Sequence, residues 1–158
     1  MKTIFLNQRK ERDELLSRPY LTRRSNQDLD LLLSSHLIKL ITGPRRVGKS
    51  TQALLMLRNR NFAYLNFDSQ PLLDAWDANL VMRMLDDVYP GYDYLLLDEV
   101  QNLDAWDLWV SELYRQGKNL VITGSNAKML SSEMATALTG KYLKVEMLPF
   151  SLEEFFDW

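Results

Sequence analysis

The chain has 158 residues, of which 46% are apolar and 25% are charged, as is typical of an ordinary globular domain with room for a core. The net charge of −2 and the pI near 5.4 exclude a strong overall attraction to nucleic acids or membrane surfaces. The absence of cysteine excludes disulfides and thiolate metal sites. No apolar run is long enough to span a bilayer and the amino terminus lacks the core of a signal peptide, so we expect a cytoplasmic protein without membrane contact.

Strands and helices alternate along the chain, as the spacing of apolar and turn-forming residues indicates. Strands are predicted over residues 36–42, 61–68, 94–97, 119–123 and 141–147. Helices are predicted over residues 7–18, 26–35, 49–57, 70–88, 105–116 and 131–138. Ser69 or Gln70 is expected to cap the fourth helix and Asp104 the fifth, with Gly117 just past the end of the fifth. The alternation predicts a three-layer α/β sandwich with a mostly parallel sheet.

The loop after the first strand reads GPRRVGKS and matches the pattern G-x-x-x-x-G-K-[ST] in its required context between a strand and a helix. Gly43 and Gly48 would let the backbone approach a phosphate closely, because they lack a side chain. The N–H groups of the loop and of the helix start would face that anion. The alternative is a glycine-rich turn that carries Lys-Ser by chance, and the flanking strand and helix favour the phosphate loop.

The residues that close this loop can each bind one part of a nucleotide. Lys49 carries a positive charge for the β- and γ-phosphates, Ser50 offers a hydroxyl to Mg²⁺, and Thr51 can reach the α-phosphate. Arg45 and Arg46 either touch the nucleotide or a partner, or are solvated loop arginines. We therefore expect ATP or ADP with Mg²⁺ to be bound by Gly43, Pro44, Arg45, Arg46, Val47, Gly48, Lys49, Ser50 and Thr51.

A second polar element follows the apolar run Tyr94-Leu95-Leu96-Leu97. Asp98 would emerge beside the phosphate loop and hold Mg²⁺, directly or through water. Glu99 would orient and deprotonate the attacking water, which favours hydrolysis over phosphoryl transfer to a small molecule. The two carboxylates can instead simply end a strand at the surface. Gln101 is expected either to bond near the γ-phosphate or to cap the turn.

A third polar element follows the strand that ends at Thr123. If this strand lies between the other two, Ser125 or Asn126 would sit near the γ-phosphate and the attacking water. Because Gly, Ser and Asn all favour turns, an ordinary strand-to-helix turn is the alternative.

The segments GPRRVGKST, LLLDEVQNL, VITGSNAKML and LPFSLEEF occur in this order and together resemble the AAA+ superfamily of P-loop ATPases. More narrowly, they resemble bacterial and archaeal predicted ATPases in which such a domain precedes a C-terminal region of poorly known function. The resemblance covers residues 20–158 and implies a five-stranded sheet in the order 5-1-4-3-2. We accordingly expect an N-terminal helical segment over residues 1–35 and a P-loop ATPase core over residues 36–158.

The resemblance also implies roles for individual residues. The nucleotide and Mg²⁺ contacts would be Lys49, Ser50 and Thr51, and residues 20–24 would lie near the adenine. The implied metal ligands are Ser50 and Asp98, and the implied catalytic residues are Glu99 as the base, Lys49, and Asn126 as the first sensor.

Two features depart from the family pattern. The region where AAA+ proteins carry an arginine finger reads ATALTGKYLKV, which contains Lys141 but no arginine. Lysine lacks the planar fork of arginine and is not equivalent to it. The residue with which a ring neighbour usually activates hydrolysis is therefore missing from this region. The sequence also stops within a helix that starts at Ser151, where the family continues into a helical lid. We therefore expect a missing C-terminal lid or effector region, and weak self-association through the uncovered Phe155, Phe156 and Trp158.

Three functions are compatible with these residues. The first is a Mg²⁺-dependent ATPase that couples its nucleotide state to an attached effector region or to a protein or nucleic-acid partner that the sequence does not identify. The second is a nucleotide-gated binding module with negligible turnover, which is the behaviour expected of the chain by itself. The third is a P-loop kinase, which Asp98-Glu99 and the lack of an acceptor lid disfavour.

Overall fold

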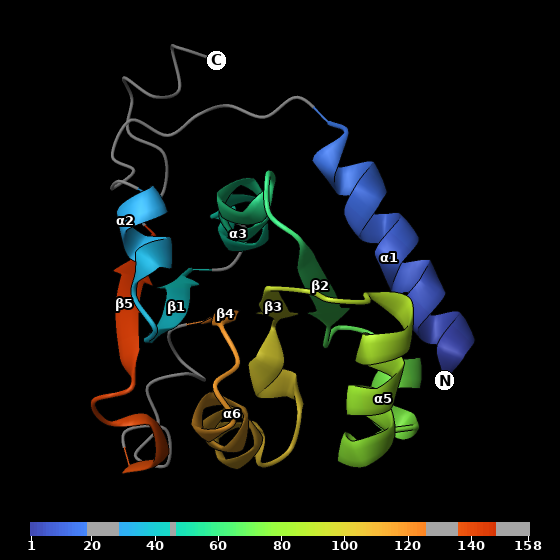
Figure 1. Cartoon of the computed structure of the whole chain (residues 1–158). Coiled ribbons are helices and arrows are strands. Elements are labelled where there is room, and N and C mark those ends of the chain that lie inside the picture. The colour runs from blue at the N-terminus through green and yellow to red at the C-terminus, as the bar shows by residue number, and fades with distance from the viewer. Residues whose placement is uncertain (19–28, 45–46, 126–135, 148–158) are drawn as a thin grey trace.

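A five-stranded parallel sheet forms the centre of the molecule (Figure 1). The structure is a computed structural model and describes residues 1–18, 29–44, 47–125 and 136–147. Its strands are β1 (Ile38–Gly43), β2 (Phe62–Asn66), β3 (Tyr94–Asp98), β4 (Leu120–Ser125) and β5 (Tyr142–Glu146). They lie in the order β2-β3-β4-β1-β5, which confirms the predicted order and places β4 between β1 and β3.

Helices cover both faces of the sheet, so the molecule has the three layers that the sequence predicts. The helices are α1 (Lys2–Leu16), α2 (Leu29–Ser34), α3 (Lys49–Leu57), α4 (Gln70–Asp74), α5 (Ala78–Val88) and α6 (Trp106–Arg115), with a 3-10 turn η1 (Val100–Asn102). In Figure 1, α2 and α3 lie on one face, α5 and α6 lie on the other, and α1 runs along the β2 edge. Most of the helix predicted over residues 131–138 lies outside the described ranges. None of the helices within those ranges is both long and apolar enough to cross a membrane.

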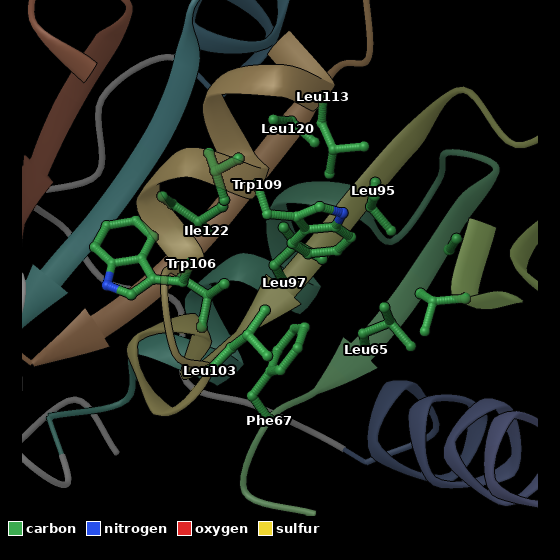
Figure 2. Close-up of a cluster of buried hydrophobic side chains, with 14 of the residues drawn as sticks. Leu65, Phe67, Leu95, Leu97, Leu103, Trp106, Trp109, Leu113, Leu120 and Ile122 are labelled. Atoms are coloured by element: carbon green, nitrogen blue, oxygen red, sulfur yellow. The ribbon is translucent and has the colours of Figure 1, made fainter. Parts of the chain in front are cut away.

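Each face of the sheet buries its own hydrophobic core, because successive strand residues point to opposite faces. In β3, Leu95 and Leu97 belong to the core beneath α5 and α6, whereas Leu96 belongs to the core beneath α3. Figure 2 shows the first of these cores, in which Trp109 and Phe67 lie around Leu97. The apolar run of β3 is therefore covered on both sides, as expected of a central strand.

An aromatic cluster interrupts what the sequence predicts as a single helix over residues 70–88. The Trp76 ring centroid lies 4.8 Å from that of Trp109 and 5.6 Å from that of Phe67. The chain leaves the helical path after Asp74 and brings the Trp76 indole against these rings. The prediction of one helix is therefore wrong, because tertiary packing of one indole overrides the local helical pattern.

Both helices that replace the predicted one are capped by a side chain. The Ser69 hydroxyl accepts a hydrogen bond from the Leu72 N–H at 3.3 Å, which confirms the predicted cap of α4. Asp77 has an extended backbone, and its carboxylate accepts from the Leu80 N–H at 3.0 Å at the start of α5. Each cap satisfies an N–H group that has no partner within its helix, so the break leaves few backbone groups unpaired.

Two other helix boundaries differ from the prediction. Helix α1 begins at Lys2, well before the predicted start, and its early turns bury Phe5 in the core. Asp104 does not cap α6, because Ala105 occupies the N-cap in a left-handed conformation with a φ of 56° and without a side-chain cap. Gly117 follows the end of α6 with a φ of 82°, as predicted.

Helix α1 is attached to the edge strand β2 by hydrogen bonds from its side chains. The Gln8 amide donates from Nε2 to the Asn66 carbonyl at 3.0 Å and accepts at Oε1 from the Asn66 N–H at 3.1 Å. Arg12 donates from Nη1 to the Phe62 carbonyl, and its guanidinium carbon lies 4.9 Å from the Phe62 ring centroid. One glutamine side chain thus exchanges two hydrogen bonds with β2, as a paired strand residue would.

We expect Gln8→Ala to lower the free energy of unfolding by roughly 1–3 kcal/mol, because it removes the side-chain acceptor of the Asn66 N–H and leaves the Asn66 carbonyl only the donor from Ser69 N–H. Urea unfolding followed by circular dichroism measures the loss. Asn7→Ala is the matched control, since Asn7 is an exposed amide on the same helix. Equal stability of the wild type and Gln8→Ala would show that this amide does not hold α1.

Candidate functional site

The loops that follow β1, β3 and β4 converge at the carboxyl edge of the sheet. Because these three strands are adjacent and parallel, they end on the same side. The register pairs Gly43, the last residue of β1, with Ser125, the last residue of β4. The glycine loop, the Asp98-Glu99 pair and the end of β4 therefore lie together.

The two glycines of the loop are required for different reasons. A Cβ on Gly43 would lie 2.5 Å from the carbonyl oxygen of Met147 and 3.0 Å from Cγ1 of Val47, so a side chain does not fit. At Gly48 no atom of the described residues would lie within 4 Å of an added Cβ, but its φ of 93° favours glycine. Gly48 is also the N-cap of α3, where helical N–H groups lack partners within the helix. An anion can therefore approach the backbone at Gly48 and bind the start of α3.

Lys49 places a buried ammonium inside the loop. The side chain is 5% exposed, and Nζ donates to the carbonyl oxygens of Gly43 at 3.2 Å and Pro44 at 2.9 Å. Within the part of the chain that the structure describes, no carboxylate forms an ion pair with it. A buried charge bonded only to neutral carbonyls is costly, and an anion in the loop would offset that cost. The loop therefore fits a phosphate group.

Asp98 is a buried carboxylate that three hydroxyl groups hold in place. Its Oδ1 accepts from Ser50 Oγ at 2.7 Å and from Thr123 Oγ1 at 2.5 Å, and its Oδ2 accepts from the Tyr64 hydroxyl at 3.3 Å. Burial raises the pKa of Asp98, and the hydrogen bonds from Thr123 and Ser50 partly oppose that rise. Ser50 and Asp98 offer the oxygen atoms that Mg²⁺ binds when phosphate and water complete its shell. These residues therefore fit the metal that the sequence implies.

Glu99 lies in a left-handed turn between β3 and η1. Its φ is 55°, which is uncommon for a residue with a side chain. Its N–H donates to Thr123 Oγ1 at 3.0 Å, and its carboxylate Oε2 accepts from Gln101 Nε2 at 2.6 Å. The turn therefore separates two neighbouring carboxylates, with Asp98 buried among hydroxyls and Glu99 half-buried beside an amide.

The remaining predicted site residues divide between the loop and the segments outside the described ranges. Thr51 is half-buried in the first turn of α3, Pro44 is exposed, and Val47 is buried in the core beneath α3. Outside the described residues lie Arg45, Arg46, Asn126, the segment 20–24, and the aromatic residues Phe155, Phe156 and Trp158.

Reasoning from the sequence assigns no role to two of the hydroxyls that hold Asp98. Thr123 carries a weak signal, since it is a polar residue within an apolar strand that ends at the predicted site. Tyr64 carries none, because a tyrosine in an aromatic-rich strand usually packs in a core. Burial next to Asp98 raises the pKa of Tyr64, so its hydroxyl stays a donor.

The sequence matches the AAA domain family over residues 35–156. Over 136 residues it is 37% identical to an uncharacterized protein from Methanocaldococcus jannaschii, and this alignment covers 82% of the chain and 30% of that protein. Over 143 residues it is 35% identical to an uncharacterized protein from Haemophilus influenzae, and this alignment covers 82% of the chain and 35% of that protein. The chain thus spans about a third of the length of these two relatives.

The matched region contains every strand and loop that brings the site together, from β1 to β5. The five-stranded parallel sheet, its order and the helices on both faces are those of a P-loop NTPase fold. The chain belongs to the AAA domain family of P-loop ATPases.

Proposed function

We propose that this chain binds ATP or ADP with Mg²⁺ in the loop Gly43–Thr51 and hydrolyses ATP, and that its nucleotide state controls a partner or an attached effector region. The observation that carries the proposal is the buried ammonium of Lys49, which is bonded only to loop carbonyls in the described chain. A β- or γ-phosphate would supply the missing anion. Membership of the AAA domain family supports a nucleotide as the source of that phosphate.

The site residues would divide the chemistry of hydrolysis between them. Ser50 and Asp98 would hold the metal through hydroxyl and carboxylate oxygens, which lie 2.7 Å apart. Bound Mg²⁺ would neutralise charge on the phosphate oxygens. Lys49 would bind the same oxygens as a point charge. Glu99 would accept a proton from the attacking water, because Asp98 is already committed to three hydroxyl donors.

A nucleotide-gated binding module with negligible turnover is the second candidate, and the contact between Gln101 and Glu99 favours it. Oε2 of Glu99 is 2.6 Å from the Gln101 amide, so one oxygen of the base already has a partner. Lys141 lies in the region where the resemblance to AAA+ proteins would place an arginine finger, and its Nζ donates to Ser111 Oγ at 2.9 Å and to the Ala137 carbonyl at 3.2 Å. Two of the three N–H donors of this ammonium are therefore used within its own chain. Both contacts favour slow hydrolysis by the isolated chain.

We expect Lys49→Ala to weaken ATP binding by roughly 10- to 100-fold, because a hydrogen bond to a charged group contributes about 1.5–3 kcal/mol. The fold should persist, since the change removes a buried and unpaired charge. Isothermal titration calorimetry in the presence of Mg²⁺ measures the affinity. Lys10→Ala is the control, because Lys10 is exposed on α1. Equal affinities of the wild type and Lys49→Ala would place the phosphate elsewhere.

We expect Glu99→Gln to retain ATP binding and to slow phosphate release by about 100-fold or more, because the amide keeps the shape of the side chain but cannot accept the proton. Steady-state release of phosphate from ATP is the measurement. Glu112→Gln, an exposed position on α6, controls for the loss of one negative charge. A rate that does not respond to Glu99→Gln would support the binding module or place the base elsewhere.

The stability of the ligand-free chain should depend on pH through Asp98. Burial raises the pKa of Asp98, so its contribution to stability is present below its unfolded pKa and is lost as the pH rises through the folded value. We therefore expect Asp98→Asn to melt at a higher temperature than the wild type at about pH 8, because the variant does not bury a charged carboxylate. The melting temperature should rise by roughly 2–4 °C for each kcal/mol that this burial costs the wild type. The difference should shrink towards about pH 4, where the carboxyl of the wild type is protonated.

Differential scanning fluorimetry at both pH values measures this difference. Asp86→Asn is the control, because Asp86 is exposed on α5. Excess Mg²⁺ and ADP should reverse the order, because only the wild type keeps the metal-binding carboxylate. A ligand-free wild type that melts above Asp98→Asn at the higher pH would contradict the expected burial cost.

A further inference from the structure

The strand at the centre of the site carries a threonine whose hydroxyl contacts both acidic residues. Thr123 lies in β4 and is 0% exposed. Its Oγ1 donates to Asp98 Oδ1 at 2.5 Å and accepts from the Glu99 N–H at 3.0 Å. We propose that Thr123 is a positioning residue for ATP hydrolysis, which orients the metal-binding carboxylate and the backbone of the catalytic base as one unit. This inference rests on the proposed function, because it assigns Thr123 a part in that reaction.

The two contacts use the only proton of this hydroxyl and one of its two lone pairs. A hydroxyl has one proton to donate and lone pairs to accept. Because the amide of Glu99 can only donate, the Thr123 proton must be directed to Asp98. Serine could make the same pair of bonds, whereas valine has nearly the same shape and could make neither. Comparing serine and valine at this position therefore shows whether the site requires the hydroxyl or only the shape of the side chain.

The contact with Glu99 matters because the backbone of this residue is in an uncommon conformation. A left-handed φ of 55° in a residue with a side chain persists only where its surroundings hold it. Thr123 Oγ1 holds the N–H at the start of this turn, and the Gln101 amide holds the carboxylate at its other end. Without the hydroxyl, we expect the turn to relax and the Glu99 carboxylate to leave its position relative to the phosphate loop.

The neighbouring strand offers a matched control for the substitution. Thr42 in β1 is also 0% exposed, and its Oγ1 has no hydrogen-bond partner in the structure as described. Thr42→Val and Thr123→Val therefore make the same chemical change at two buried strand positions, and only the second removes hydrogen bonds. Thr123→Ser completes the set, because it keeps the hydroxyl and loses a methyl group. Circular dichroism and thermal melting first establish that each variant folds.

The first measurement needs no nucleotide. Amide hydrogen exchange at Glu99, followed by NMR in the full chain, reports whether its N–H is still held. We expect exchange at Glu99 to be roughly fivefold faster in Thr123→Val, because a hydrogen bond of about 1 kcal/mol is lost. Thr123→Ser and Thr42→Val should exchange at this amide like the wild type. Unchanged protection of the Glu99 amide in Thr123→Val would overturn the proposal.

The second measurement is ATP turnover, with kcat and KM determined separately. We expect Thr123→Val to lower kcat by roughly 10- to 100-fold with little change in the affinity for ADP, since misplacing a catalytic group by about 1 Å has an effect of this size. Thr123→Ser should restore most of the rate, and Thr42→Val should keep it. A Thr123→Val variant with the wild-type kcat would overturn the proposal, as would a folded Thr123→Ser variant that is as slow as Thr123→Val.

The two measurements distinguish failure of this inference from failure of the proposed function. A wild type that binds nucleotide but does not turn ATP over would overturn the proposed hydrolysis. The exchange experiment would still show whether the hydroxyl holds the turn at Glu99. If Thr123→Val does not fold, Thr123→Ser decides the matter, because loss of turnover with the hydroxyl in place would overturn the role assigned to it.

Discussion

The pairing of β4 with both β1 and β3 is the constraint on which the site depends. Two strands that flank a third lie roughly 9–10 Å apart, too far for the ends of β1 and β3 to contact each other directly. Helix α3 spans this gap, because its second residue, Ser50, reaches Asp98 above β4. Thr123 contacts the same carboxylate from β4 itself. The site thus uses side chains from α3, β3 and β4, and a different strand order would separate them.

The site is costly to keep in the ligand-free molecule. Lys49 and Asp98 are both buried, and in the described part of the chain neither forms an ion pair. Buried charges of this kind destabilise a fold, and apolar strands such as β3, with Leu96 and Leu97 facing opposite cores, offset that cost. A ligand that carries both a cation and phosphate groups would pair both charges at once. Binding and folding stability are therefore linked through the same two side chains.

Local sequence patterns predict most of the fold and part of the site. The glycine spacing and the apolar run place the loop and the start of α3 at Lys49, where the structure has it. The break before Asp77 could not be predicted locally, because it depends on Trp76 packing against rings distant in the sequence. Asp98 could be predicted from its place after an apolar strand. The contacts of Thr123 could not, since they depend on the alignment of β3 with β4, which neither strand encodes alone.

The polar attachment of α1 affects how the molecule behaves among its own copies. A strand edge with free N–H and C=O groups is a template on which another chain can add a strand. Gln8 and Arg12 form hydrogen bonds with backbone groups of β2, so α1 protects this edge of the sheet from pairing with another chain. Phe5 and Gln8 are the buried residues of this helix. Detaching α1 from the sheet therefore exposes less apolar surface than detaching a helix with a full apolar stripe. Strand exchange and fibril growth would therefore require only that α1 detaches from β2. Their rates would be set by this detachment and not by unfolding of the whole sheet.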